Sequence, residues 1–129
     1  MNNGSSEFCL IKVQNYSSYS DFASKTNETY MGAFEISRQY KIPFIPYDFP
    51  GFNDTYNSIF EHRWARIIDH DLQGFGGLLE SINNIASNDS QTILFHSWND
   101  FSESTFMEPS VEFGYSYLET VNEIGRAHV

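Results

Sequence analysis

The chain has few cysteines, few basic residues and no long apolar run. Cys9 is the only cysteine among 129 residues, which excludes a disulfide framework and a cysteine-based metal site within the chain. It lies in an apolar run, so we expect a buried and unreactive thiol. Seven Lys and Arg stand against 17 Asp and Glu, giving a net charge of −10. This balance argues against nucleic acid and anionic membrane surfaces as partners, and no run has the length of a membrane span.

Histidines stand close to acids, but their spacing does not suit a metal site. His70 lies between Asp69 and Asp71 without the regular spacing of metal ligands, and a predicted helix separates these residues from His62. We therefore expect no metal and no cofactor. His96 stands at the exit of a predicted strand, where it either touches a cleft or is a buried histidine of the fold.

Segments typical of strands and helices alternate along the chain. Short apolar runs predict strands at 8–13, 42–47 and 92–95, and periodic apolar residues predict helices at 27–40, 78–86 and 114–123. This alternation predicts an α/β fold with a parallel sheet. The segment 48–74 is too long for an ordinary connection and predicts a functional insertion with some helix of its own.

The Gly-rich run at 74–77 resembles a phosphate-binding loop only superficially. No Lys-Ser or Lys-Thr pair follows it, as such a loop would require. We expect this run to be the approach to the helix that follows.

Polar and aromatic residues follow each predicted strand, at 14–19, 47–57 and 98–108. Parallel strands end at one edge of the sheet, so these loops are expected to form a cleft. Loops are polar in any protein, which accounts for the hydroxyl residues. Exposed aromatic side chains such as Tyr47, Phe52 and Trp98 are less easily explained in this way, and they favour a sugar site.

Two acids close behind the third strand form the candidate catalytic pair. Asp100 and Glu103 are three residues apart and follow the apolar run that ends at Phe95. Cleavage of a glycoside needs one carboxylic acid to protonate the leaving oxygen and one carboxylate to assist the attack. The charge of Asp100 would raise the pKa of Glu103, as a general acid requires. The alternative interpretation is a turn with two solvated surface charges.

The string W-N-D-F-S-E-S-T-F-M-E-P-S-V-E-F-G-Y-S-Y-L-E, at 98–119, resembles a block of the glycoside hydrolase family 99 superfamily. That superfamily includes endo-α-mannosidases and WbsX-type proteins, and its block reads W-N-E-W-x-E-G, then E-P, then G-Y-x-Y-L-E. The first half is still more similar to family 71, the α-1,3-glucanases, with W-N-D-Y-x-E-S. Upstream, P-Y-D-F-P-G-F-N-D-T at 46–55 is similar to the P-G-[WFY]-[DN] loop of the same superfamily.

The resemblance implies a fold and a set of roles. The fold would be a (β/α)8 TIM barrel, of which residues 1–123 would form the C-terminal part, about three βα units. Asp100 would be the general base and Glu103 the general acid. Asp100 stands where the mannosidase pattern has Glu, which favours the glucanase analogy at this position. The residues expected to bind substrate, each with a structural role as the alternative, are Tyr16, Tyr47, Asp48, Asn53, Asp54, Trp98, Asn99 and Glu108.

The functional expectation is a glycoside hydrolase acting on an α-linked polysaccharide or glycan, inactive as a fragment. The alternative is a non-hydrolytic WbsX-like protein of polysaccharide assembly, or a carbohydrate-binding protein. Residues 124–129 resemble a translated sequencing adapter and are expected to be a non-native tail. The substrate class would suit secretion or the cell envelope, but the sequence leaves compartment and oligomeric state open.

Overall fold

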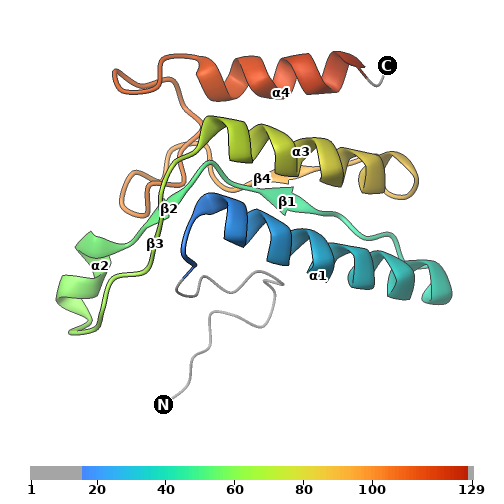
Figure 1. The fold of residues 1–129 in the computed structure, drawn as a ribbon, viewed down its shortest axis with the longest axis horizontal. Coiled ribbons are helices and arrows are strands. Elements are labelled where there is room, and N and C mark those ends of the chain that lie inside the picture. Colours follow the sequence, from blue (N-terminus) through green and yellow to red (C-terminus); the bar gives the residue numbers. More distant parts are fainter. Residues whose placement is uncertain (1–15, 128–129) are drawn as a thin grey trace.

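The structure is a computed structural model that describes residues 16–127, and these form a mixed α/β domain (Figure 1). The predicted strand at 8–13 lies outside the described residues. The elements in chain order are α1 (Tyr19–Tyr40), β1 (Tyr47–Asp48), β2 (Phe52–Asn53), α2 (Thr55–Phe60), β3 (Ile67–Ile68), α3 (Leu72–Ser87), β4 (Leu94–Phe95) and α4 (Ser116–Ala127).

Two short pairs of strands organise the chain. β1 and β4 are parallel, with Tyr47 opposite Leu94 and Asp48 opposite Phe95, and α3 lies on the connection between them. β2 and β3 are antiparallel and belong to the long segment between β1 and α3, together with α2. The insertion with its own helix, predicted from the length of this segment, is therefore present.

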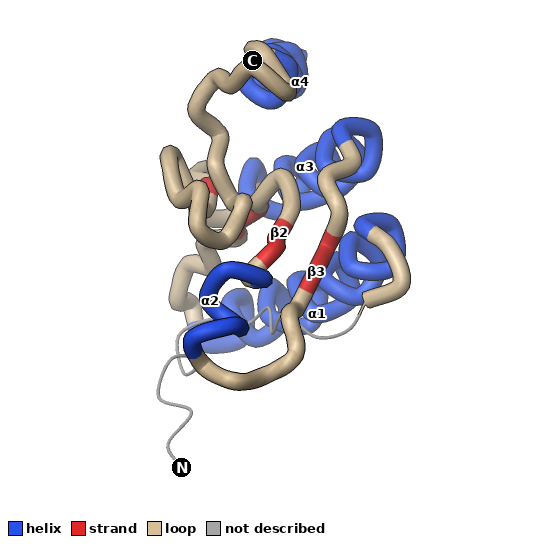
Figure 2. The backbone as a smooth tube through the Cα atoms, turned by 90° about the vertical axis from the view of Figure 1, so that its left-hand side faces the viewer, coloured by secondary structure: helices blue, strands red, loops and turns tan. Residues whose placement is uncertain are grey.

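The three long helices lie in a row on one side of the parallel strands, as Figures 1 and 2 show from two directions. Phe95 faces this helix layer, because its ring contacts Phe75 of α3. Successive residues of a strand point to opposite faces, so Leu94 points to the other side. Leu94 is 55% exposed, and the apolar Ile45 just before β1 is 43% exposed. As far as residues 16–127 show, the side of the strands away from the helices therefore carries uncovered apolar surface.

α1 begins at Tyr19, which is earlier than the predicted start at residue 27. Ser18 caps the helix, because its hydroxyl accepts a hydrogen bond from the Asp21 N–H at 3.1 Å. Tyr19, Phe22 and Tyr30 then bury one face of the first turns against the core. The first two turns of α1 were not predicted because this stretch is rich in polar residues, and Ser and Asp are common both in loops and at helix caps.

α3 also begins earlier than predicted, so the Gly-rich run is helical and not an approach to the helix. The Asp71 carboxylate caps the helix by accepting the Gly74 N–H at 3.0 Å. Gly74 is required for close packing: a Cβ atom there would lie 2.7 Å from Cδ1 of Tyr19 in α1. The apolar stripe from Leu78 to Ala86 lies buried in the core, as its spacing predicted.

Candidate active site

The loops that carry the predicted site start side by side. The His96 N–H, just after β4, donates to the Asp48 carbonyl at the end of β1 over 3.0 Å. The insertion leaves β1 at this edge, and the loop containing the two candidate acids leaves β4 at the same edge. The parallel pairing of two strands thus brings together segments far apart in sequence.

The loop after β4 is closed on itself by hydrogen bonds across its base. The Ser97 N–H donates to the Thr105 carbonyl at 2.7 Å, and the Met107 N–H donates to the Ser97 carbonyl at 2.9 Å. The hydroxyls of Ser97 and Thr105 are also hydrogen-bonded, 3.1 Å apart. Asp100 and Glu103 therefore lie within one tightly held loop and not on a free surface segment.

Asp100 is oriented by its own loop. Its Oδ1 accepts hydrogen bonds from the Ser102 hydroxyl at 2.7 Å and from the Glu103 N–H at 3.1 Å. Its backbone N–H donates to the Ser97 hydroxyl at 2.9 Å. These contacts hold the carboxylate next to Glu103, with one oxygen engaged in the turn.

Glu103 is partly buried, and its environment favours the protonated form. Burial raises the pKa of Glu103, and the negative charge of Asp100 raises it further. His96 and Arg66 act in the opposite direction without reversing the shift. The Glu103 carbonyl accepts the Asn53 N–H at 2.8 Å, so β2 of the insertion is hydrogen-bonded to the loop of the acids.

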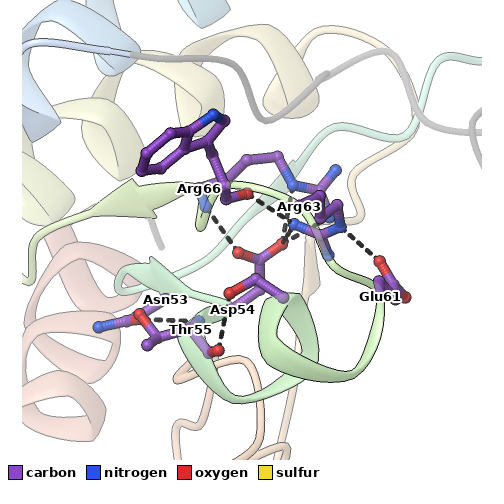
Figure 3. Close-up of polar contacts among 8 residues, drawn as sticks. Asn53, Asp54, Thr55, Glu61, Arg63 and Arg66 are labelled. Carbon is purple, nitrogen blue, oxygen red and sulfur yellow. Dashed lines mark hydrogen bonds and ion pairs between the residues drawn. The ribbon is translucent and has the colours of Figure 1, made fainter.

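Asp54 is completely buried and holds the insertion together (Figure 3). Its Oδ1 accepts the Arg66 N–H at 2.6 Å, and its Oδ2 accepts Nε and Nη2 of Arg66 at 2.8 and 2.6 Å. Nη1 of Arg63 lies 2.8 Å from the same Oδ2. Burial alone would raise the pKa of Asp54, but the hydrogen bonds from Arg66 and Arg63 lower it overall. The carboxylate is thus occupied by two arginines that the motif analysis did not single out.

Asp48 is equally buried but has no cationic partner in the described part of the chain. Its Oδ1 accepts the Phe49 N–H at 2.8 Å and lies 2.9 Å from the Tyr19 hydroxyl, while Oδ2 has no hydrogen-bond partner within residues 16–127. Burial raises the pKa of Asp48 to about 8 despite these hydrogen bonds. The Tyr19 hydroxyl also lies 2.7 Å from the Phe49 carbonyl, so its single proton faces two acceptors. A proton on Asp48 would relieve that shortage.

The aromatic candidates fall into two groups. Tyr16 and Tyr47 belong to the packing beside Asp48: Tyr16 contacts Phe22 edge-on at 5.4 Å, and Tyr47 lies 6.4 Å from Phe49. Trp98, in contrast, is 55% exposed in the loop of the two acids.

The two remaining predicted residues lie in this same loop. Asn99 is exposed next to Trp98, and Glu108 is partly buried. The Glu108 N–H donates to the Trp98 carbonyl at 2.8 Å. The structure therefore brings Asn53, Trp98, Asn99, Asp100, Glu103 and Glu108 to the loop of the acids, and it places Tyr16, Tyr47 and Asp48 in the packed layer beside it.

His70 is a further contact to this loop that the motif analysis did not assign. Its Nε2 lies 2.9 Å from the carbonyl oxygen of Ser104, the residue after Glu103. The ring packs directly on Gly51, where a Cβ atom would lie only 2.3 Å from Cδ2 of His70. Gly51 precedes β2 and His70 follows β3, and no sequence pattern indicated that these two residues are in contact.

Neither a metal cluster nor a membrane helix is found in residues 16–127. No three His, Cys, Asp or Glu side chains in this range lie close enough together to hold a metal ion. None of its helices is long and apolar enough to cross a membrane.

The parallel β1–α3–β4 unit, with its acids behind the strand ends, defines this chain as part of an α/β domain that carries polar loops at one edge of its sheet. A family model described as Glycosyltransferase WbsX matches residues 2–121, and the chain belongs to this carbohydrate-active family. The match confirms the resemblance to WbsX-type proteins. No curated protein and no solved structure matches the chain.

Proposed function

We propose that the chain belongs to a glycoside hydrolase that cleaves an α-linked polysaccharide or glycan, with Glu103 as general acid and Asp100 as general base. The observation that carries this proposal is the raised pKa of Glu103 beside the carboxylate of Asp100 in a loop held by hydrogen bonds. Two carboxyl groups whose environments differ are the usual basis for dividing acid and base roles.

In this mechanism the proton of Glu103 passes to the glycosidic oxygen as the bond to the sugar breaks. Asp100 accepts a proton from the attacking group. That group is the substrate's own 2-hydroxyl by analogy with the endo-α-mannosidases, or water by analogy with the α-glucanases. Burial of Glu103 supports its role, because a carboxyl group with a raised pKa keeps its proton nearer neutral pH.

Substrate contacts are proposed for the remaining predicted residues of the same loop. Trp98 has an exposed ring that can stack on a sugar face. Asn99, Glu108 and Asn53 would hydrogen-bond to hydroxyl groups. Asp54 is fully engaged by arginines, so for it we propose support of the insertion in place of direct contact.

Three other predicted residues support the site from behind. Tyr16, Tyr47 and Asp48 lie in packed surroundings beside the loops. We propose that they hold the end of β1 in place.

We also propose that residues 1–123 form the C-terminal part of a (β/α)8 barrel. The support is the uncovered side of the parallel strands, where Ile45 and Leu94 are exposed. Parallel sheets are normally covered on both faces, so further strands would close over these residues. The helix layer packs on the opposite side of these strands, as the outer ring of helices does in such a barrel.

A second candidate is glycosyl transfer, which the family description favours. The same two carboxyl groups would serve, but a sugar hydroxyl would replace water as the final acceptor. The two activities differ in their product: transfer lengthens a glycan, whereas hydrolysis releases a reducing sugar.

Glu103→Gln tests the proposal in a longer natural protein that contains this sequence. Sugar release is measured on α-mannan and α-1,3-glucan. We expect the variant to lose about 100-fold or more in rate, because Gln cannot donate the proton, while the folded structure is kept. Glu119→Gln, an exposed position on α4, is the matched control and should retain wild-type activity.

Release that is equal in wild type and Glu103→Gln would refute the assignment of the acid. Formation of longer glycans without release of sugar would favour transfer over hydrolysis. Absence of both reactions on every substrate, with sugar binding retained, would refute the hydrolase and favour a carbohydrate-binding or polysaccharide-assembly function.

A further inference from the structure

A cavity of about 370 Å³ lies beside the loop of the two acids, between the β2–β3 pair and the segment before α4. Its walls include Ser104, which directly follows Glu103. The other side chains that matter for its chemistry are Phe52, Asn53, Asp69, His70, Glu112 and Phe113.

We infer that this cavity is a further subsite for a neutral sugar unit of the substrate, next to the catalytic pair. The inference rests on the proposed function, because it takes the ligand to be the same glycan. It adds that the enzyme binds units of the glycan beyond the one at the scissile bond.

The residue types that line the cavity suit a sugar ring. Phe113 is partly exposed and supplies aromatic surface for the C–H face of a pyranose. Phe52, which was expected to be exposed, is instead buried in the core and contributes only to the apolar wall of the cavity. Asp69 and Glu112 are exposed carboxylates and accept hydrogen bonds from hydroxyl groups. The volume lies near the lower end of small-molecule sites, which suits a sugar unit better than a whole nucleotide.

The charge of the cavity selects against anionic ligands. Asp69 and Glu112 contribute two negative charges, and the residues that line the cavity include no Lys or Arg. A phosphate or a uronic acid would be repelled by the two carboxylates. A neutral hexose would find these carboxylates as acceptors and the Asn53 amide and the Ser104 hydroxyl as donors. The chemical class is therefore a neutral hexose.

His70 connects the cavity to the acid loop. The Ser104 carbonyl can only accept, so Nε2 of His70 carries the proton of that hydrogen bond and Nδ1 is an acceptor. Burial lowers the pKa of His70, although Glu112 and Asp69 oppose the shift, which favours the neutral ring. Ser104 has a left-handed backbone with φ of 54°, a conformation that side chains other than Gly seldom adopt. A ligand in contact with His70 therefore touches the side chain that hydrogen-bonds to the Ser104 carbonyl, directly after Glu103.

A larger hollow of about 440 Å³ lies at the opposite end of the sheet, near the end of α3. Its lining includes Asn83, Gln91 and Gly125 but no carboxylate and no aromatic ring. The cavity of about 370 Å³ beside the acid loop is therefore the better candidate for a sugar subsite, although it is the smaller of the two.

Binding to the same longer protein, followed by NMR, tests the inference without any need for catalysis. The probes are α-1,3-linked glucotriose, α-linked mannotriose and, as the anionic comparison, trigalacturonate. We expect at least one neutral trisaccharide to shift the His70 ring signals and trigalacturonate to leave them unchanged. The double variant Asp69→Ala/Glu112→Ala should weaken that binding about tenfold or more, since two charged acceptors are lost.

The matched control is Glu28→Ala/Glu35→Ala, which removes two exposed charges from α1 and should bind as wild type does. Because this readout needs no turnover, a failure of the catalytic assignment is separated from a failure of the subsite. The inference is overturned if neither neutral trisaccharide shifts His70, if trigalacturonate binds as well as they do, or if the Asp69/Glu112 variant binds unchanged.

Discussion

Asp48 and Asp54 are two completely buried aspartates at either end of the connection between β1 and α2, and their surroundings are opposite in kind. Asp54 receives hydrogen bonds from Arg63 and Arg66, and its pKa is lowered. Among the described residues, the partners of Asp48 are a tyrosine hydroxyl and a backbone N–H, and its pKa is raised to about 8.

The difference shows that burial alone does not decide the charge of a carboxyl group. Burial acts against the ionised form at both positions, but two guanidinium groups reverse the outcome at Asp54. Asp54 therefore stabilises the insertion as an anion, whereas Asp48 is a neutral acid in the packed layer near neutral pH. Glu103 lies between these extremes, with burial and a neighbouring negative charge on one side and Arg66 on the other.

The largest expected effect is the removal of a pH dependence by Asp48→Asn. The pKa of Asp48 is 3.8 ordinarily and about 8 in the folded chain, so the folded state holds an extra proton between these values. The stability that this proton confers is complete below about pH 4, declines as the pH rises and is lost above about pH 8. The total is on the order of 5 kcal/mol. Urea unfolding from about pH 5 to about pH 8.5 measures most of this change.

The Asn variant mimics the protonated acid at every pH, so its stability should exceed that of wild type increasingly as the pH approaches 8. Glu28→Gln, which neutralises an exposed acid on α1, is the control and should keep the pH dependence of wild type. Curves of unfolding free energy that run parallel for wild type and Asp48→Asn would contradict the raised pKa.

The second effect is the loss of stability in Asp54→Asn near neutral pH. The substitution leaves Arg63 and Arg66 without their shared carboxylate, and breaking a buried pair of this kind costs about 3–5 kcal/mol. Both guanidiniums are partly exposed, so we expect about 3 kcal/mol, the lower end of that range. Urea unfolding at pH 7 gives the value, and hydrogen exchange of the Asn53 N–H shows whether the insertion loosens from Glu103.

Asp48→Asn is the matched comparison for this measurement, because it makes the same replacement at an equally buried position. At pH 7 it should stabilise the chain, because the wild-type carboxyl group has by then lost much of the stability that its proton confers. Equal destabilisation by the two variants would mean that loss of packing, and not loss of charge, dominates at both positions.

The sequence predicted those features of the fold that depend on local periodicity. The α/β alternation, the stripe of α3 and the insertion after β1 follow from the spacing of apolar residues and from segment length. The starts of α1 and α3 were placed too late, because Ser18 and Asp71 are capping residues that also occur in loops. The fold-level prediction was therefore better for helix faces than for helix ends.

The candidate site was predictable only where its residues are neighbours in sequence. Asp100 and Glu103 stand in one motif, and the effect of the Asp100 charge on the pKa of Glu103 was expected from their spacing. The states of Asp48 and Asp54 depend on partners 29 residues upstream and 12 residues downstream, Tyr19 and Arg66. No local pattern distinguishes a buried aspartate with a tyrosine from one with an arginine, so this contrast required the structure.

The smallest effect separates geometry from charge at Asp54. Arg66 places both Nε and Nη2 on one carboxylate oxygen, whereas Arg63 gives that oxygen a single nitrogen and turns its Nε to Glu61. Lysine keeps the charge but cannot make the contact through two nitrogens. We therefore expect Arg66→Lys to cost about 1–2 kcal/mol in unfolding free energy and Arg63→Lys less than about 1 kcal/mol.

Combining each lysine variant with Asp54→Asn in a double-mutant cycle isolates the pairwise energy between Asp54 and that arginine. Equal coupling energies would show that Asp54 responds to positive charge alone. A larger coupling for Arg66 would show that the fixed orientation of its guanidinium, next to the backbone N–H that also binds Asp54, keeps this buried carboxylate ionised.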